Sequence, residues 1–579
     1  MLTRSSTKGL VILGFSRFLT GILVFLFSVS LWSQVRIIQW TDAHSSIETI
    51  SKQVLAIDYA GRDFLRSHPK GEVIVYVVGD FTSINAINNE EGGWSSFEAL
   101  RLLRERGYTV LFTPGNHDAF DWTVKIDGAQ LFLKQMQKIQ AWGVKILVNN
   151  LRKKTKDFQS LTSPSYELAT LKKKTHIVGL TLPILMSKSN LTEASAKSLF
   201  AEIEPYSKTF RRVFPEMARK KVEAIIFGVH QGHEKLKRQI PVIKDLMKNK
   251  NLAIDIPLML GAHDHLVVSY HHAGTHFSNS GSYGSFNIID INATGEVLAN
   301  HIQHVPMTLK DAHSVRPELF QKGSIYLNDI TDQDIERAPW LHKFHRSIQA
   351  QIDEANKKLQ RVRGYLPKAI DEHKAHMKSG QSELGSLLAE SLVRWARISF
   401  SLAPRIPVIA LANSSSYRRD SGLPAGPIIE KTLREFYPFH TEATAYQLKG
   451  REIKKMYFSL RRFYANGGGE LHSPQLNFDF RERGEDLEMR LSPGVWAPIE
   501  EERRYYVVFD GWLSEHRFGQ GYRLTEWSEV FADKKPMAQE SYQDLLVRHF
   551  PSVVEAHQRG QLLYPLGLGL PVQCRILFH

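Results

Sequence analysis

The sequence has very little cysteine. Cys574 is the single cysteine among 579 residues, so no disulfide can form within the chain and no cysteine-based zinc site can be built. Any metal ion must therefore be held by histidine, aspartate, asparagine or glutamate side chains. A chain that is exported without disulfides is more typical of bacteria than of animal secretion.

Long apolar runs are also scarce. Three basic residues precede an apolar run from Phe18 to Trp32, which has the length of a signal-peptide core and falls short of the roughly 20 residues of a bilayer span. We interpret residues 1–34 as a signal peptide, with an uncleaved N-terminal anchor as the alternative. The protein is then exported to the bacterial periplasm or cell surface, and it contacts a membrane only if this segment is retained.

Internal repeats and low-complexity segments are absent, and the charge is unbalanced. The chain has 74 Lys and Arg against 60 Asp and Glu, a net charge of +14, which favours anionic ligands or surfaces. The basic runs Lys172–Lys174 and Arg219–Lys221 have no interleaved aromatic residues. We therefore expect solvated surface there and no nucleic-acid polymer as a partner.

Short apolar runs of strand length alternate with helix-like stretches in the first half of the chain. Five such runs are Val35–Trp40, Val73–Val78, Thr109–Phe112, Val222–Val229 and Ile256–Leu260. They are rich in β-branched and aromatic residues and nearly continuous, which is typical of strands buried on both faces. With helix-like stretches between them, the pattern predicts a layered α/β domain over residues 35–330.

The pattern changes after residue 330. Apolar residues recur every three or four positions from Leu341 to Val362, which predicts one long amphipathic helix, closed by Gly364 and Pro367. We interpret residues 331–374 as a linker helix. Residues 375–579 then form a second domain of mixed α/β character.

Each of the five runs is followed by Asp, His or Asn, which are residue types that can bind metal ions. These residues are Asp42 and His44, Asp80, Asn116 with His117, His230, and His263 with His265. Open α/β sheets place their ligands at the carboxyl ends of their strands. A spacing of two, as in Asp42 and His44, directs both side chains of extended backbone to one side. Glycines at 79, 115 and 261 allow tight turns beneath these residues.

This ordered set resembles the calcineurin-like metallophosphoesterases, and the whole chain resembles the two-domain 5'-nucleotidase family within them. That family also contains 2',3'-cyclic phosphodiesterases and nucleotide-sugar hydrolases. The second half carries the closer likeness, in Ser382–Glu390, Asn413–Arg418, Pro438–Phe439 with Gln447–Gly450, and Phe518–Tyr522. The resemblance implies an αββα-layered metallophosphoesterase domain, a linker helix and a C-terminal mixed α/β substrate domain.

The resemblance also implies two divalent metal ions. One is held by Asp42, His44, Asp80 and His265, and the other by Asp80, Asn116, His230 and His263, with Asp80 as the bridge. His, Asp and Asn donors suit Zn, Mn or Fe. A metal-activated hydroxide attacks phosphorus, and His117 donates a hydrogen bond or a proton to the leaving group.

The sequence does not decide which Asp orients His117. The family places an Asp three residues after this His, where the present chain has Phe120. Asp118, directly after the His, and Asp121, one residue later than the family position, are both candidates. His233, His271, His272 and His276 match no ligand position, and we interpret them as surface or outer histidines.

For the substrate, the resemblance implies a nucleoside held by the second domain. Phe439 and Tyr522 match two aromatic residues that enclose the base, and Asn413 and Arg418 match residues that contact base and substrate. Lys378 stands near a position where the family has an Arg, and Ser414–Tyr417 replaces a glycine-rich loop.

We therefore expect an exported phosphohydrolase with two metal ions that cleaves phosphate esters of nucleotides, as 5'-nucleotidases do. A 2',3'-cyclic phosphodiesterase or a nucleotide-sugar hydrolase is the alternative within the enzyme class. A non-catalytic nucleotide-binding protein with the same fold is the alternative outside it.

Overall fold

The structure is a computed structural model, and it divides the chain into two compact units. Unit 1 extends to Gln349 and unit 2 begins at Ala350. The described residues are 33–83, 93–120, 128–153, 156–182, 200–281, 284–298, 302–305, 327–370, 383–403, 406–413, 423–437, 442–465, 474–476, 480–483, 486–492, 495–510, 529–531 and 534–558. Among them, no helix combines the length and the apolar character needed to cross a bilayer.

The first sheet of unit 1 has seven strands in the order β15-β14-β1-β2-β3-β4-β6. Their bounds are β1 Ser33–Trp40, β2 Glu72–Val78, β3 Thr109–Thr113, β4 Lys145–Leu147, β6 Thr162–Ser163, β14 Phe286–Asn292 and β15 Gln303–Val305. The strands β1, β2 and β3 are parallel neighbours, and β14 runs antiparallel to β1. The first three predicted apolar runs are therefore adjacent strands whose carboxyl ends share one edge.

The second sheet of unit 1 has six strands in the order β12-β13-β11-β10-β8-β7. Their bounds are β7 Tyr166–Glu167, β8 Thr175–Leu180, β10 Ala224–Val229, β11 Asp255–Leu260, β12 Val267–His272 and β13 Thr275–Ser280. The strands β8, β10, β11 and β13 are parallel. The fourth and fifth predicted runs are β10 and β11, which are neighbours as well.

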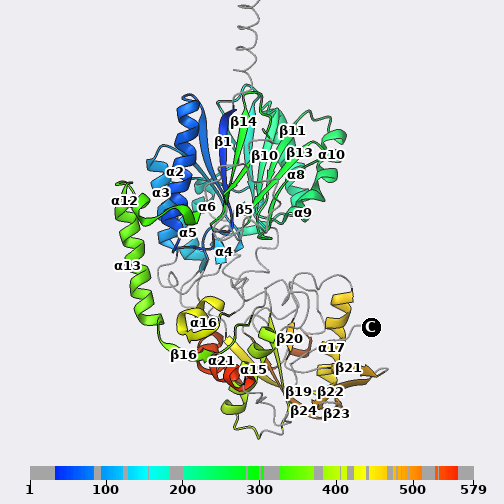
Figure 1. Cartoon of the computed structure of the whole chain (residues 1–579). Helices are drawn as coiled ribbons and strands as arrows, with labels where there is room; N and C mark the ends of the chain where they lie inside the picture. Colours follow the sequence, from blue (N-terminus) through cyan, green and yellow to red (C-terminus); the bar gives the residue numbers. More distant parts are fainter. Residues whose placement is uncertain are drawn as a thin grey trace, which may run out of the picture. The chain divides into compact units, whose positions relative to one another are not determined.

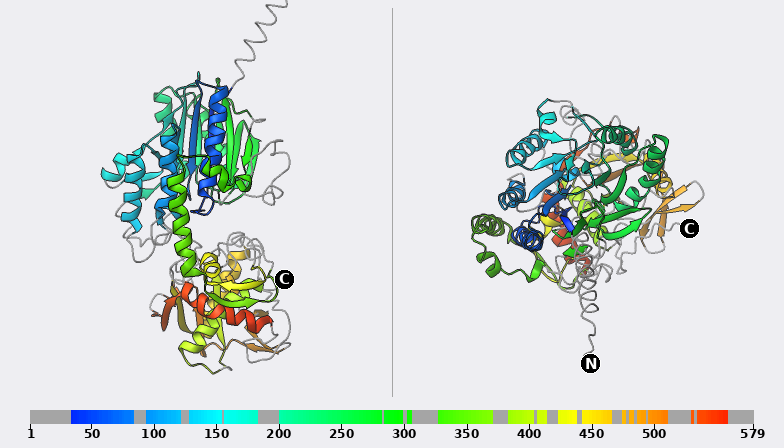
Figure 2. Two further views of the ribbon diagram at one scale, coloured as in Figure 1. Left: turned by 60° about the vertical axis from the view of Figure 1, so that its left-hand side comes forward. Right: turned by 90° about the horizontal axis from the view of Figure 1, so that it is seen from above.

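The two sheets pack face to face and helices cover their outer faces (Figures 1 and 2). Alternate residues of one strand enter different cores, because side chains alternate across a strand. In β10, Ile226 packs with Ile37 and Leu258 in the core between the sheets, whereas Ile225 and Phe227 pack in the outer core. The predicted αββα layering is thereby confirmed.

The covering helices of unit 1 come from between the strands. On the first sheet they are α2 Ile50–Ser67, α3 Trp94–Glu105 and α5 Gly128–Ala141, and on the second α8 Tyr206–Arg219, α9 His233–Lys237 and α10 Gln239–Asn249. Short elements complete the unit: α4 Asn116–Phe120, α6 Lys156–Leu161, and the pair β5 Leu151–Lys153 with β9 Phe200–Ile203.

The long amphipathic helix predicted after residue 330 is interrupted. The structure has α12 Asp332–Glu336 and α13 His342–Leu359, followed by β16 Val362–Leu366. Within α13 the predicted apolar positions Phe344 and Ile348 are buried. The expectation that the helix continues through Val362 is wrong, because this β-branched residue pairs with Ile429 of the next sheet.

Unit 2 is built on a five-stranded sheet in the order β20-β17-β24-β19-β25. Its strands are β17 Val408–Asn413, β19 Glu442–Lys449, β20 Pro474–Leu476, β24 Arg504–Phe509 and β25 Ala538–Ser541. Two smaller sheets accompany it, β16 with β18 Gly426–Ile429, and β21 Phe480–Arg483 with β22 Asp486–Ser492 and β23 Val495–Pro498.

Helices pack on the five-stranded sheet and create two cores. One core joins the sheet to α15 Glu383–Ser399, α16 Glu430–Phe436 and α21 Tyr542–Gln558, and the other contains α17 Gly450–Ala465 and residues of β21 and β22. Within α21, Tyr542, Leu546 and Phe550 are buried in the first core. The region after residue 525, which lies outside the motif resemblance, therefore supplies part of the core of unit 2.

Candidate metal centre

The polar residues predicted to bind metals lie at one edge of unit 1, at the carboxyl ends of five parallel strands. Asp42 and His44 follow β1, Asp80 follows β2, Asn116 begins α4 after β3, and His230 follows β10. His263 and His265 follow β11. The short helices α4 and α9, which leave β3 and β10, mark this end of the two sheets in Figure 1.

The backbone at this edge adopts left-handed conformations at residues other than glycine. The φ angles are 47° at Asp42, 49° at His44, 48° at Asp80, 77° at His263 and 60° at His265. Such conformations are uncommon for side-chain-bearing residues and are concentrated at functional sites. Hydrogen bonds hold the turns in place, from the Asp42 amide to the Gly79 carbonyl (3.1 Å) and from the His44 amide to the Asp80 carbonyl (3.0 Å).

Two glycines permit close packing beneath these side chains. Gly79 has a φ of 77°, and a Cβ atom there would lie 2.2 Å from Nδ1 of His230. A Cβ atom at Gly115 would lie 2.2 Å from Oδ1 of Asp80. Gly261, the third glycine expected to allow a tight turn, is less restricted, because its Cβ would come no closer than 3.2 Å to the end of the Leu236 side chain and 3.3 Å to the Gln231 carbonyl oxygen.

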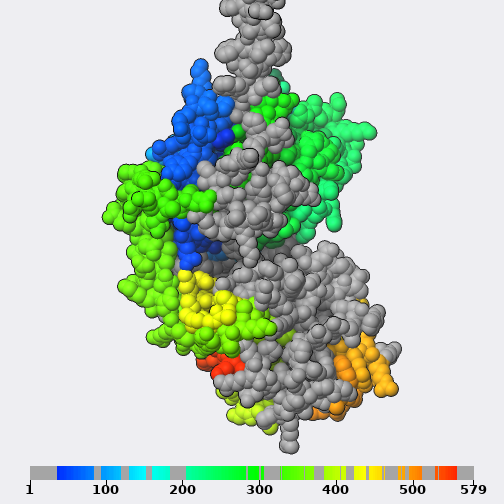
Figure 3. All heavy atoms as spheres, viewed as in Figure 1, coloured from blue at the N-terminus to red at the C-terminus, as the bar shows by residue number. Residues whose placement is uncertain are grey.

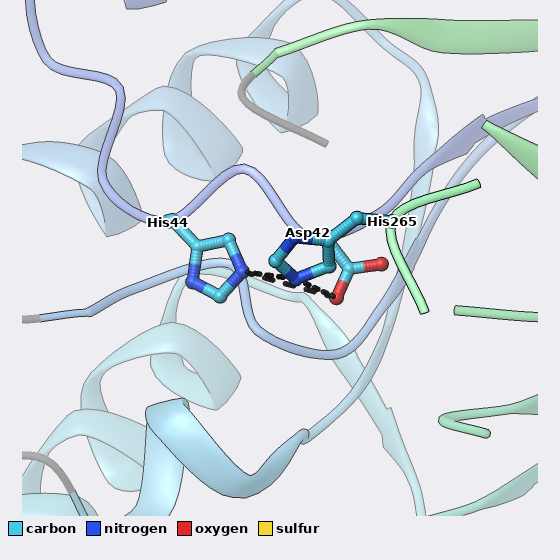
Figure 4. Close-up of side chains that lie close together, drawn as sticks. All are labelled: Asp42, His44 and His265. Atoms are coloured by element: carbon cyan, nitrogen blue, oxygen red, sulfur yellow. Dashed lines mark hydrogen bonds and ion pairs between the residues drawn. The ribbon is translucent and has the colours of Figure 1, made fainter. Parts of the chain in front are cut away.

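Asp42, His44 and His265 form one cluster (Figure 4). The Nε2 atoms of the two histidines lie 3.0 Å apart, and Oδ1 of Asp42 lies 4.0 Å from one and 3.8 Å from the other. Two donor atoms at right angles, each about 2.1 Å from a metal ion, are themselves about 3 Å apart. The spacing of the nitrogens therefore suits two neighbouring ligands of one cation.

A second cluster contains Asp80, His230 and His263. Nε2 of His230 lies 3.0 Å from Oδ2 of Asp80 and 3.3 Å from Oδ1 of Asn116. Its Nδ1 donates a hydrogen bond to the Val78 carbonyl (3.1 Å), so Nε2 is the nitrogen directed at the cluster. The structure thus brings together all four residues expected around the second ion.

Asp80 connects the two clusters. It also groups with His44 and His117, whose Nε2 lies 3.9 Å from Oδ2 of Asp80. The other oxygen, Oδ1, accepts a hydrogen bond from the His117 amide (2.7 Å). The carboxylate is therefore oriented by the α4 turn, with Oδ2 left to face the imidazoles on both sides.

The electrostatics of the site favour added positive charge. Burial raises the pKa of Asp42 well above its usual value, and the negative charge of Asp80 adds to this effect. Burial acts in the same direction on Asp80, but the imidazoles of His230 and His117 outweigh it and hold the pKa of Asp80 well below its usual value. Burial would lower the pKa of His230, yet the adjacent Asp80 carboxylate raises it to about 9.

These residues fit a divalent cation. A lone pair on His230 Nε2 and a carboxylate oxygen of Asp80 repel each other at 3.0 Å unless a proton or a metal ion lies between them. The raised pKa of His230 means that a proton takes this place in the absence of metal. A metal ion would replace that proton, as metal binding to His and carboxylate ligands generally does.

Asp118, one of the two candidate partners of His117, has other partners in the structure. Its Oδ1 accepts hydrogen bonds from the amide (2.7 Å) and hydroxyl (3.1 Å) of Thr82, and its Oδ2 accepts one from the Gly115 amide (2.9 Å). Burial and the neighbouring Asp80 raise the pKa of Asp118 to about 6. Asp118 therefore ties the loop after β3 to the loop after β2. Asp121, the other candidate, lies outside the described residues.

Asp264, which we did not single out in the sequence, anchors the turn that carries His263 and His265. Its Oδ2 accepts hydrogen bonds from the amide (2.9 Å) and Nδ1 (2.6 Å) of His233, and its Oδ1 accepts one from Asn279 (2.5 Å). His233, interpreted from the sequence as an outer or surface histidine, is therefore part of the support of this turn. The one signal in the sequence is an Asp placed between two candidate ligands.

A buried chain of hydrogen bonds also supports the turn that follows β11 and carries His263 and His265. Nδ1 of His304 donates to Asn287 (2.7 Å), Asn287 to Ser278 (2.8 Å), Ser278 to Gln39 (2.7 Å), and Gln39 to the Gly261 carbonyl (2.9 Å). All the donors point the same way, so each polar group is satisfied inside the core. These residues were missed as well, although polar side chains in otherwise apolar strands are a signal for them.

The remaining histidines and the predicted substrate residues lie elsewhere. His271 and His272 are on β12 and His276 is buried on β13, where its Nε2 contacts the Ser269 hydroxyl at 2.9 Å. Asn413 ends β17, and its side chain lies outside the described part of the chain. The same holds for the whole of Lys378, Arg418, Phe439 and Tyr522.

The structure defines a two-domain α/β protein whose first domain has αββα layers and gathers side chains that could hold metal ions at one edge. Residues 364–520 match the family model of the 5'-nucleotidase C-terminal domain, so the resemblance inferred from the motifs is confirmed. The match begins within β16 and covers most of unit 2. Among curated proteins there is no significant match.

Solved structures share the fold over nearly the whole chain. A 5'-nucleotidase precursor from Thermus thermophilus is 16% identical with a TM-score of 0.62, covering 90% of this chain and 96% of that one. A 5'-nucleotidase from Candida albicans is 12% identical (TM-score 0.55, covering 90% and 98%). The sulfate thiohydrolase SoxB, also from Thermus thermophilus, is 11% identical (TM-score 0.57, covering 90% and 94%). At these identities the likeness establishes the fold.

Proposed function

We propose that the protein is a metal-dependent phosphoric ester hydrolase that acts on nucleotides, as a 5'-nucleotidase does. One observation carries this proposal. The carboxylate of Asp80 lies between two clusters of metal-binding side chains, at the edge where five parallel strands end. The family match of unit 2 supports a nucleotide as the substrate.

Two divalent cations, of Zn, Mn or Fe, are the cofactors in this proposal. Asp42, His44, Asp80 and His265 hold one, and Asp80, Asn116, His230 and His263 hold the other. When bound, such ions supply Lewis acidity towards a phosphoryl group and towards water. The ligand atoms are His nitrogens and Asp or Asn oxygens, a set that suits these metals better than calcium.

The protein's own groups supply orientation and proton transfer. His117 lies at the margin of the site with its ring 5.0 Å from that of His44, and it is 9% exposed, so it can meet a bound ester. In our proposal its side chain donates a hydrogen bond or a proton to the leaving oxygen. Asp121 is the partner that we propose for His117, since the oxygens of Asp118 accept hydrogen bonds from Thr82 and Gly115.

Unit 2 recognises the nucleoside in this proposal. Phe439 and Tyr522 stack on the base, Asn413 and Arg418 contact base and substrate, and Lys378 adds positive charge. We also propose that residues 1–34 direct export to a bacterial periplasm or cell surface. The motif resemblance supports the first statement, and the basic residues ahead of the apolar run from Phe18 to Trp32 support the second.

A phosphate-release screen tests the proposed activity. Metal-depleted protein is reconstituted separately with Zn, Mn or Fe and supplied with nucleoside monophosphates, diphosphates, 2',3'-cyclic nucleotides and nucleotide sugars. We expect release from a nucleoside 5'-monophosphate that depends on added metal. The alternative hydrolases release no inorganic phosphate in their own step, so chromatography of the products is run beside the phosphate assay. Preferred conversion of a cyclic nucleotide into a nucleoside 2'- or 3'-monophosphate, or of a nucleotide sugar into a nucleoside monophosphate and a sugar phosphate, would favour the alternative hydrolases. Metal binding and nucleotide binding without turnover would favour a non-catalytic nucleotide-binding protein.

A comparison of two substrates tests the role of unit 2. Tyr522→Ala should raise KM for a nucleotide by roughly tenfold, since base stacking contributes about 1–3 kcal/mol per base. A small aryl phosphate does not need the base site and should change little. Equal losses on both substrates would show a folding defect, and no loss on the nucleotide would contradict the assignment.

A further inference from the structure

The amino ends of the strands of unit 1, opposite the candidate metal centre, carry a concentration of basic residues. The run Lys172–Lys174 directly precedes β8, and the run Arg219–Lys221 closely precedes β10. Lys248 and Lys250 come just before β11. Because β8, β10 and β11 are parallel, these segments lie at one edge of the sheet, which we call the basic edge.

Backbone hydrogen bonds join the segments of the basic edge. The Lys174 carbonyl accepts hydrogen bonds from Glu223 (2.9 Å) and Ala224 (3.2 Å), and the Glu223 carbonyl accepts one from Asp255 (2.8 Å). The surface is therefore held by the fold itself and not by mobile side chains. The α8–α10 region, coloured between teal and green, lies at the surface on the face seen in Figure 3.

The first residue of β1, Ser33, lies at the same edge. Ser33 pairs with Asn292 at the start of β1, and the next residue, Ala293, accepts a hydrogen bond from the Lys172 amide (3.0 Å). The apolar run from Phe18 to Trp32 directly precedes Ser33 in the sequence. The basic edge and the attachment point of an apolar segment are therefore adjacent.

Most of the positive charge at this edge is not neutralised. Lys173 pairs with Asp255, Lys220 pairs with Glu216, and the ammonium of Lys174 donates to the Lys220 carbonyl. Five others are free of ion pairs with the described residues: Lys172, Arg219, Lys221, Lys248 and Lys250. All five are exposed. Solvated cations on one rigid surface, without interleaved aromatic side chains, suit an extended anionic surface better than a stacked base.

We propose that the basic edge docks unit 1 on an anionic phospholipid surface. The lysines and arginine interact with lipid phosphates, next to the point where the N-terminal apolar segment joins β1. This arrangement turns the opposite edge, with the candidate metal centre, away from the membrane. The cations act in this way whether the N-terminal segment is retained or removed, which departs from the expectation that only a retained segment contacts a membrane. No residue of the candidate metal centre takes part, so the proposal does not depend on the proposed activity.

Vesicle binding of the full chain tests the proposal. The readout is the ratio of partition coefficients for vesicles of phosphatidylglycerol with phosphatidylcholine and for vesicles of phosphatidylcholine alone. This ratio isolates the contribution of charge, since an apolar segment inserts into both. We expect a ratio well above one that falls towards one as salt is raised.

A charge variant at the basic edge is compared with a matched variant at the other edge. Lys172→Gln/Arg219→Gln/Lys250→Gln should lower the ratio by on the order of 100-fold, or about fivefold for each cation near the surface. The control, Lys235→Gln/Lys237→Gln/Arg238→Gln, changes the charge equally at the start of α9 and α10, next to the candidate metal centre. The control should keep most of the ratio.

Thermal unfolding shows that the edge variant is folded. Four outcomes would overturn the proposal. They are a wild-type ratio near one, an unchanged ratio in the folded edge variant, equal losses in the two triple variants, and tighter salt-dependent binding to duplex DNA than to anionic vesicles.

Discussion

The two edges of unit 1 lie at opposite ends of its parallel strands and differ in the sign and the burial of their charged residues. At the carboxyl edge, carboxylates such as Asp42 and Asp80 are buried, and the backbone is held in left-handed conformations. At the amino edge, cations such as Lys172 and Lys250 are exposed, although Lys221 there also has a left-handed backbone, with a φ of 55°. The difference shows that one sheet architecture can concentrate desolvated charge at one end and leave solvated charge at the other.

Removing the shared carboxylate should give the largest effect at the carboxyl edge. Asp80→Asn should bind less metal and lose roughly a thousandfold in kcat/KM, because it removes several kcal/mol of charge stabilisation shared by both clusters. Metal analysis and phosphate release measure both losses.

A buried carboxylate elsewhere in the same sheet is the matched control. Asp290→Asn breaks the 2.7 Å ion pair with Arg36, so it should lower stability and leave the metal content unchanged. Full metal content and activity in Asp80→Asn would contradict the assignment of Asp80 as the shared ligand.

A methyl group added next to Asp80 should lower metal affinity almost as strongly as the loss of the carboxylate. Gly115→Ala would bring a Cβ to 2.2 Å from Oδ1 of Asp80, so this side chain must move. We expect metal affinity to fall by about 10–100-fold, as for other changes that misorient a ligand. Gly261→Ala, whose Cβ would come no closer than 3.2 Å to any neighbouring atom, should change affinity much less. Similar metal titrations for both variants would show that close packing under Asp80 is unimportant.

Removing the side chain that supports the turn after β11 should have an intermediate effect on metal affinity. Asp264→Ala removes the acceptor for His233 and Asn279, and metal affinity should fall by about tenfold through disorder of His263 and His265. The absorption spectrum of the Co²⁺-substituted protein reports on ligand geometry and should change. Asp264→Asn keeps one acceptor oxygen and should restore part of the affinity. An unchanged spectrum in the Ala variant would limit Asp264 to a role in stability.

Acid should weaken unit 1 through two of its buried histidines, His276 and His304. Burial lowers the pKa of His304 to about 3 and that of His276 to about 4, below the usual 6.5 of an unfolded chain. Between these values the unfolded chain binds more protons, so stability is complete above pH 6.5 and falls as the pH falls. Each histidine contributes up to about 1.4 kcal/mol per pH unit in this window.

Urea unfolding between pH 7 and pH 5 measures this effect. His304→Gln retains a donor for Asn287 but does not titrate here, so its stability should decline less steeply than that of the wild type. Parallel curves would mean that His304 is protonated in the folded state as easily as in the unfolded state.

The smallest effect is expected at the basic edge. Lys248→Gln removes an exposed charge without an ion pair, so the free energy of unfolding should change by no more than about 0.5 kcal/mol. Turnover of a small aryl phosphate should stay unchanged, since the residue lies in the last turn of α10, before the amino end of β11. A larger change in either quantity would break the contrast between the two edges.

Much of this contrast was present in the sequence. Continuous apolar runs such as Val73–Val78 predict buried strands, because burial on both faces removes the alternation of polar residues. The polar residues that follow those runs were predicted to lie together, because the carboxyl ends of parallel strands share one edge of a sheet. The substrate residues Phe439 and Tyr522 remain predictions, since their side chains lie outside the described part of the chain.

Other features could not be predicted from local patterns. Helical periodicity extended to Val362, but pairing with Ile429 placed this residue in a strand. Asp118 and Asp121 were equivalent candidates for the partner of His117, and only the positions of Thr82 and Gly115 reveal what Asp118 binds. Contacts between distant segments decide such cases, and periodicity contains no information on them.

The sequence alone determined which residue types follow which strands, because strand burial and turn chemistry are local properties. The tertiary structure decided which of these residues meet. His44 and His265 are separated by 221 positions, and their nitrogens are brought to 3.0 Å because two sheets pack with their carboxyl ends at one edge. The basic runs come together at the opposite edge because β8, β10 and β11, which they precede, are parallel neighbours within one sheet.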